Sequence, residues 1–131
     1  MKKENLPDCF KTDLVLRWVK DSWWKVDVPY GVDTKTVGFL IVPINFLTDG
    51  PSIPKMPGLY EEFRDRAWPA AVVHDYLYSI DCPINCTREQ ADDVFHELMD
   101  ALYPGWIDKI KNDEEWLGVR TGGGLFFRKE K

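Results

Sequence analysis

The chain contains few of the side chains that build metal clusters or disulfide frameworks. Its 131 residues include 2 histidines and 3 cysteines. The cysteines are Cys9, Cys82 and Cys86, an odd set whose only close pair has a C-x3-C spacing in an expected loop. We therefore expect free thiols, because too few ligands are available for a structural zinc site.

Long apolar runs and an excess of basic residues are also missing. No stretch approaches the roughly 20 apolar residues of a transmembrane helix, and residues 1–7 lack the apolar core of a signal peptide. We expect no transmembrane segment and a chain that stays in the compartment where it is made. The net charge is -5, with 17 Lys and Arg against 22 Asp and Glu, which argues against a nucleic-acid partner. The short basic segment at 128–131 is expected to be solvated.

The composition is sufficient for one globular domain over residues 1–131. Hydrophobic residues make up 44% of the chain, enough to bury a core at this length. Strand patterns fill the first half and helix patterns the second. We predict an α+β fold with a small N-terminal antiparallel sheet at about 13–46, a loop at 47–64, and a helical part at about 65–122. The helical part is predicted to contain an antiparallel helix pair and a third, C-terminal helix.

The strand pattern is clearest between residues 23 and 43. Alternating residues over 23–30 indicate a half-buried strand. The residues on one face of that strand are Trp24, Val26, Val28 and Tyr30. Residues 31–34 have the composition of a turn and 36–43 favour a second strand, so the two strands are predicted to form a hairpin. Residues 14–19 favour a third strand.

Helix signals dominate from residue 67 onward. Residues 67–80 are almost wholly apolar apart from one adjacent pair of polar side chains, which indicates a buried helix. Residues 87–90 form a Thr-x-x-Gln capping box that opens a second helix, and Pro104-Gly105 ends it. The core-facing stripe of the second helix is Ala91, Val94, Phe95, Leu98 and Leu102. A third, amphipathic helix is predicted around 107–117.

The polar pair inside the buried helix is His74-Asp75. Burying an imidazole and a carboxylate is costly unless each finds a partner or a metal, so the pair is either satisfied structure or a functional site. The short connection between the two helices can bring Asp92 opposite His74, the arrangement of a general base and its orienting group. Tyr78 lies four residues after His74 and is placed to brace the cluster. Alternatively, Asp92 pairs with Arg88 one turn earlier.

A cation site is a further expectation for this region. On a helix Asp75 points about 100° away from His74, so it can bind a hard cation. The loop at 45–54 is where backbone carbonyls are placed to face a ligand, although it can equally be a plain connector. A structural cluster would instead have Asp75 bound by backbone N–H groups or by an arginine. The candidates are Arg64, Arg66 and Arg120.

Several ordered blocks resemble the signature of a known family. Residues 48–54, 70–78 and 88–95, with a Val-Pro-x-x-Phe lead-in at 42–46, look like the blocks of the domain-of-unknown-function family numbered 1353, which is common in bacteriophages and prophages. The resemblance covers about residues 42–120. It implies a phage-encoded protein that is synthesised in the host cytoplasm.

The same blocks are similar, more distantly, to the secreted phospholipases A2, especially the prokaryotic ones. This resemblance implies that His74 is the general base for water and that Asp92 orients it. It also implies that Asp75, Asp49 and the carbonyl region of Gly50 bind Ca²⁺, which would polarise the carbonyl of a phospholipid or another ester.

One departure from the phospholipases concerns the disulfide that ties their calcium loop to the His-Asp helix. The corresponding positions here are Pro51 and Ala71, which suits a chain that folds in a reducing compartment. Two hypotheses from different classes follow. The first is a calcium-dependent acyl-ester hydrolase. The alternative is a non-catalytic phage protein, either a component of the virion or tail in contact with other virion proteins, or an accessory factor acting on the host.

Overall fold

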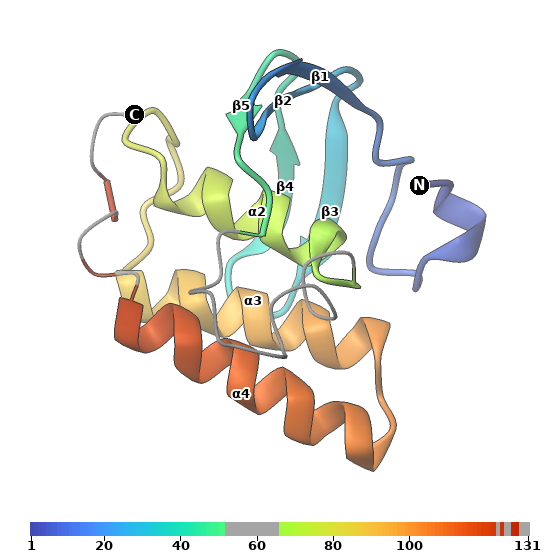
Figure 1. Cartoon of the computed structure of the whole chain (residues 1–131), viewed down its shortest axis with the longest axis vertical. Helices are drawn as coiled ribbons and strands as arrows, with labels where there is room; N and C mark the ends of the chain where they lie inside the picture. Colours follow the sequence, from blue (N-terminus) through green and yellow to red (C-terminus); the bar gives the residue numbers. More distant parts are fainter. Residues whose placement is uncertain (52–65, 123, 125–126, 129–131) are drawn as a thin grey trace.

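The computed structural model describes residues 1–51, 66–122, 124 and 127–128. Among these, the elements run in the order η1 (Lys3–Asn5), β1 (Leu16–Lys20), β2 (Trp23–Val26), β3 (Tyr30–Thr34), β4 (Gly38–Val42), β5 (Leu47–Thr48), α2 (Trp68–Tyr78), α3 (Arg88–Leu102) and α4 (Trp106–Gly122). The strands precede the helices and all their pairings are antiparallel. The predicted α+β fold is therefore confirmed (Figure 1).

The strands form two small sheets. One has the order β1-β2-β5 and the other consists of β3 and β4. The segment around Phe10 adds a single bridge to Val32 on the side of β3 that faces away from β4. The inward-facing side chains Val26, Tyr30, Val32, Leu40 and Val42 are all buried, so both sheets contribute to one core.

The predicted strand over 23–30 and the predicted turn at 31–34 were wrong. β2 ends at Val26, and the chain leaves the sheet before Pro29, which has no backbone N–H to give to a ladder. Residues 30–34 then form β3, and the reversal follows at 35–37. The Thr34 hydroxyl accepts a bond from the amide of Val37, and Gly38 has φ +83. The predicted strand at 36–43 is confirmed as β4, but its hairpin partner is β3 and not the segment 23–30, because β2 pairs with β1 and β5.

The three helices lie side by side below the sheets, and consecutive helices run antiparallel (Figure 1). α3 is placed between α2 and α4, and it also meets β3. The predicted helix at 67–80 is confirmed as α2, although it is shorter at both ends. Among the described residues, no helix has the length and apolar character needed to cross a membrane. Cys9, Cys82 and Cys86 are free thiols, as predicted.

Most of the predicted loop at 47–64 lies outside the described residues. Its first part is ordered by packing against the start of α2, where Thr48, Gly50 and Pro51 are buried. Gly50 has φ +67, and its amide donates to the Thr48 hydroxyl at 3.0 Å. A Cβ at Gly50 would overlap the indole of Trp68, and that indole makes an edge contact with Trp24. This segment therefore links β5 to α2 without space for a larger residue.

Gly38 and Gly50 both have positive φ, but only at Gly50 would a Cβ also meet a neighbouring side chain. Alanine variants at the two positions therefore distinguish the cost of backbone strain from that of steric overlap. Gly38→Ala should lower the free energy of unfolding by about 1 kcal/mol, because the left-handed backbone disfavours a Cβ although nothing lies near it. Gly50→Ala should cost roughly 3 kcal/mol, because the overlap with Trp68 adds to the same strain. Urea unfolding of both variants measures the difference, and equal losses would contradict the close packing of Gly50 on Trp68.

Candidate functional site

α2 supplies a buried surface with a polar interruption. Pro69 occupies its first turn, where the missing N–H costs no helical hydrogen bond. The buried side chains of the helix are Pro69, Ala70, Ala71, Val72, Val73, Tyr76, Leu77 and Tyr78. His74 and Asp75 are half-buried between them. The apolar sequence thus fixes the helix in the core and carries the imidazole into it.

The start of α3 is fixed by the predicted capping box. The Thr87 hydroxyl accepts from the Gln90 amide at 3.1 Å, and the Gln90 side chain accepts from the Thr87 amide at 2.9 Å. This reciprocal pair sets where the helix begins. Asp92 follows one turn later and is fully buried. α4 packs against α3 on this side, and its Arg120 binds the carboxylate.

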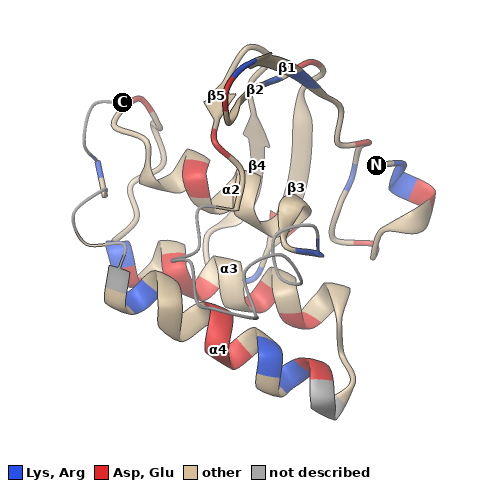
Figure 2. Cartoon of the chain, in the orientation of Figure 1, with Lys and Arg blue, Asp and Glu red and all other residues tan. Residues whose placement is uncertain are grey.

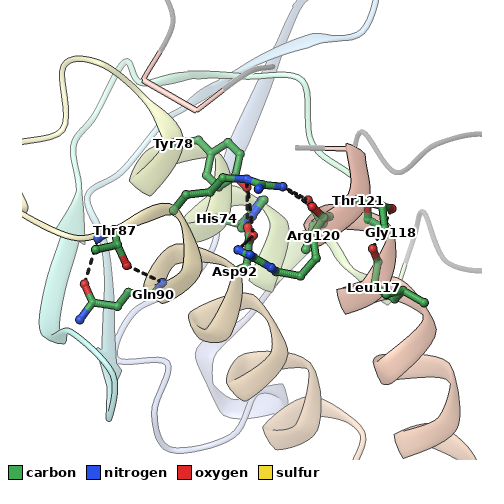
Figure 3. A network of polar contacts seen from close by, with 11 residues as sticks. His74, Tyr78, Thr87, Gln90, Asp92, Leu117, Gly118, Arg120 and Thr121 are labelled. Atoms are coloured by element: carbon green, nitrogen blue, oxygen red, sulfur yellow. Dashed lines mark hydrogen bonds and ion pairs between the residues drawn. The ribbon is translucent and has the colours of Figure 1, made fainter. Parts of the chain in front are cut away.

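The carboxylate of Asp92 receives hydrogen bonds from both neighbouring helices, α2 and α4 (Figure 3). His74 Nε2 lies 2.8 Å from Oδ1, and the Tyr78 hydroxyl donates to the same oxygen at 2.5 Å. Arg120 Nη1 donates to Oδ2 at 2.8 Å. The structure therefore brings together His74, Tyr78 and Asp92, the three residues predicted from the sequence. Arg120 was considered as a partner of Asp75 and instead binds Asp92.

Arg88 is a second cation at this carboxylate. Its Nε lies 3.9 Å from Asp92 Oδ2 and donates to the Tyr78 hydroxyl at 3.3 Å. Its Nη2 donates to the backbone carbonyls of Val119 and Arg120 at the end of α4. The alternative pairing of Asp92 with Arg88 thus coexists with the contact to His74. Basic and acidic residues meet where the start of α3 lies beside the end of α4 (Figure 2).

The environment of Asp92 favours its ionised form. Burial by itself would raise the pKa of this carboxyl, but the hydrogen bonds from His74 and Tyr78, the charge of His74 and the bond from Arg120 together lower it below its usual value. Burial, and then the hydrogen bond to Asp92, raise the pKa of Tyr78 well above its usual value. Tyr78 therefore stays a neutral donor to a charged acceptor.

The imidazole of His74 has one nitrogen bound and one available. Because Asp92 is a carboxylate, Nε2 carries the proton and donates it. Within the described part of the chain, Nδ1 makes no hydrogen bond. The ring lies between the rings of Tyr78 and Phe95, with centroids 4.3 Å and 5.3 Å away. The side chain keeps 13% of its surface exposed, so the ring lies at the edge of the core.

The predicted cation ligands lie on two segments that pack together. Asp75 is on α2, next to His74 in sequence, and Asp49 and Gly50 follow β5. Carboxylate and carbonyl oxygens are ligands that Ca²⁺ takes. Among the described residues, no group of three or more His, Cys, Asp or Glu side chains could hold a metal ion. A calcium site here would therefore depend on backbone carbonyls as well as on the two carboxylates.

The end of the chain contacts Tyr78, which the sequence did not indicate. The amide of Arg128 donates to the Tyr78 carbonyl at 2.6 Å, and its guanidinium donates to the carbonyls of Ser79, Cys82 and Ile84. Phe127 packs its ring edge-on against Tyr78, with centroids 5.1 Å apart. The prediction of a solvated basic end was wrong for Arg128, because its guanidinium donates hydrogen bonds to backbone carbonyls of the loop between α2 and α3.

The second histidine forms a separate pair on the surface. His96 Nε2 lies 2.6 Å from Asp113 on α4 and 3.7 Å from Asp100 on its own helix. All three side chains are substantially exposed. The chain therefore contains one buried and one exposed His–Asp pair, which makes His96 a natural control for His74.

The comparisons with known proteins identify one family. A protein-family model described as "Protein of unknown function (DUF1353)" matches residues 24–119. The match begins earlier than the expected residue 42 and takes in the strands from Trp24 onward. No curated protein and no solved structure matches the chain.

Replacing the buried carboxylate tests the electrostatic role of Asp92. Asp92→Asn should lower the free energy of unfolding near neutral pH by roughly 3 kcal/mol, since His74, Tyr78 and Arg120 lose a charged acceptor. The native pKa of Asp92 lies below the unfolded value of about 3.9. Its contribution is therefore complete above that pH and is lost as the pH falls through the native pKa. The difference in the free energy of unfolding between wild type and variant should therefore decrease as the pH is lowered. Urea unfolding at a series of pH values measures it.

The matched control is Asp93→Asn, which removes the same charge one residue further along α3, where the side chain is half-buried. We expect it to change stability by less than about 0.5 kcal/mol. An Asp92→Asn variant as stable as this control at neutral pH would contradict the network.

Proposed function

The chain belongs to this family of proteins of unknown function, and we propose that it is an acyl-ester hydrolase in which His74 and Asp92 activate water, with phospholipids as the substrate class. The observation that carries the proposal is the 2.8 Å contact between His74 Nε2 and Asp92, which leaves Nδ1 without a hydrogen bond in the described structure. The distant resemblance of the His-Asp helix to the secreted phospholipases A2 supports the choice of substrate. We also propose that the protein is encoded by a bacteriophage, as the resemblance to the family's signature blocks implies.

The proposed reaction needs a base and a group that stabilises its protonated form. Nδ1 of His74 accepts a proton from water as the water oxygen attacks the ester carbonyl. Asp92 keeps the ring in the tautomer with a free Nδ1 and stabilises the imidazolium that forms. The same proton then passes from Nδ1 to the leaving alcohol as the ester bond breaks. Tyr78 and Arg120 hold the carboxylate in place and are positioning residues.

Calcium is part of this proposal as a bound cofactor. Asp75, Asp49 and the Gly50 carbonyl would hold the ion, and it would supply positive charge to the developing oxyanion. All three are oxygen donors, which suits a hard cation. Asp75 is adjacent to His74, so a cation bound there would lie on the same helix as the base.

A second candidate function is favoured by the arginines. Arg120 and Arg88 both neutralise Asp92, which is the arrangement expected of a buried charge network that only stabilises a fold. A non-catalytic virion or tail protein would use the His74–Asp92 pair in this way. Stoichiometric amounts of the chain in purified phage particles, together with no ester hydrolysis, would favour this candidate.

The two histidines allow a matched test of the hydrolase. Wild type and both variants, His74→Gln and His96→Gln, are assayed for fatty-acid release from phospholipid vesicles and for cleavage of short acyl esters. His74→Gln should lower kcat by about 100-fold or more, because general-base catalysis contributes a factor of this order. His96→Gln should retain wild-type activity, since His96 is bound at a separate surface pair.

Activity that persists in a folded His74→Gln variant would exclude His74 as the base. Equal losses in both variants would show that the effect is not specific to the buried pair. No hydrolysis by wild type, with or without calcium, would leave the structural candidate.

A thermal unfolding titration tests the cation site without relying on activity. A ligand that binds the native state alone stabilises it by about 2.7 kcal/mol at 100 times its Kd, so Ca²⁺ should raise Tm by several degrees. Asp75→Asn should abolish that rise. The control is Asp81→Asn, which removes an exposed carboxylate just after α2 and should leave the rise unchanged. If Ca²⁺ does not shift Tm of wild type, the calcium proposal is wrong, while the His74 assay still decides the base.

A further inference from the structure

β4 has one edge paired with β3 and another edge that is open in the described structure. The register places Val32 opposite Leu40, with Asp33 opposite Phe39 and Gly31 opposite Ile41. Leu40 and Val42 face the core, whereas Phe39 and Ile41 are 57% and 51% exposed. An exposed strand of this kind is a template for pairing with another chain.

The hydrogen bonds that β3 makes on its side away from β4 show which way its backbone N–H and C=O groups point. The amide of Lys11 donates to the Gly31 carbonyl at 2.8 Å, and the amide of Asp33 donates to the Cys9 carbonyl at 2.8 Å. Gly31 and Asp33 therefore point their backbone groups away from β4. Because these groups alternate along a strand, Val32 points its own groups toward β4 and exchanges bonds with Leu40.

The same alternation determines which backbone groups of β4 point out from its open edge. If Leu40 faces β3, then Phe39 and Ile41 turn their N–H and C=O groups to the opposite side. Neither residue has a backbone hydrogen bond on that side within the described part of the chain. Two donors and two acceptors are therefore presented in a row, next to two exposed apolar side chains.

We propose that β4 pairs antiparallel with β4 of a second copy of this chain, about a two-fold axis at Leu40. In this register Phe39 faces the partner's Ile41 and Ile41 faces the partner's Phe39. Each of these two pairs exchanges both backbone hydrogen bonds, so all eight open groups of the two edges are satisfied. The two hairpins become one continuous four-stranded sheet, and the interface is self-complementary, as a two-fold axis requires.

Charge and order favour a second copy as the occupant. Residues 36–48 contain no Lys, Arg, Asp or Glu, and β4 carries no charged residue in Figure 2. Two chains with a net charge of -5 can therefore meet here without placing like charges opposite each other. The strand is also held in place by β3, so neither partner has to become ordered on pairing, as a free peptide would.

The edge also lacks the usual protection against self-pairing. Natural edge strands are commonly blocked by a Lys or Pro, or by an inward-pointing charge. Gly38–Val42 has none of these, and Phe39 and Ile41 would become cross-strand neighbours about 5.5 Å apart between Cα atoms. Burying these aromatic and β-branched side chains against each other adds to the backbone bonds.

The test combines mass measurement with hydrogen exchange on the full chain. Sedimentation velocity over a wide concentration range should show wild type shifting from monomer to twice the monomer mass. Amide hydrogen exchange should slow at Phe39 and Ile41 as the dimer forms, and it should change little at Leu40, whose amide already faces β3. Ile41→Pro should weaken dimerisation about 30-fold or more, because it removes one outward N–H from each copy.

Two variants control for effects on folding. Ile41→Pro leaves the β3–β4 bonds intact, and an unchanged circular dichroism spectrum checks this. Should it unfold, Phe39→Lys provides the second test. It places one positive charge on each side of the axis, within the interface, and should yield a monomer. Leu117→Lys makes an equivalent change at an exposed position on α4 and should still dimerise. A wild type that stays monomeric, a dimer without protection at Phe39 and Ile41, or equal losses in Leu117→Lys would overturn the proposal.

Discussion

The helical half of the molecule depends on the buried charge of Asp92. A carboxylate removed from water is strongly unfavourable unless donors surround it. Here α2 supplies His74 and Tyr78, α4 supplies Arg120, and Arg88 on the same helix adds a more distant cation. The positions of the three helices relative to one another are therefore constrained by a single carboxyl group as well as by apolar packing.

This network is suited to positioning a base and equally to stabilising a fold. What distinguishes the two is the ring nitrogen that the network does not use. A purely structural histidine in a core is usually satisfied at both nitrogens, whereas His74 offers Nδ1 at the edge of a half-buried site. The arginines act in the opposite direction, since they share the negative charge that would otherwise stabilise an imidazolium. The chemistry of the site is set by the balance between these two effects.

Local sequence patterns predicted the structural features that depend on residues close to one another in the chain. The buried helix, the capping box at Thr87 and the approach of His74 to Asp92 all follow from helical periodicity and a short connection. The division of residues 23–34 into two strands, β2 and β3, could not be predicted in this way. Side chains alternate in the same pattern whether one strand continues or the chain passes to another sheet. Arg120 was expected beside Asp75 and not beside Asp92, which lies 28 positions away. Arg128 was not expected at the site at all, since it lies 49 positions from Ser79. Contacts of that range depend on how the helices pack, which no local pattern specifies.

The distribution of donors around Asp92 also has a consequence for how the protein folds. Were α2 and α3 to dock while α4 stayed detached, Asp92 would be enclosed without Arg120, and the carbonyls that Arg88 reaches at the end of α4 would be absent. Such a partly folded state would hold an under-compensated charge in an apolar interface. Docking of the last helix and closure of the helix pair are thus thermodynamically coupled, so the helical half should unfold as one cooperative unit and not helix by helix.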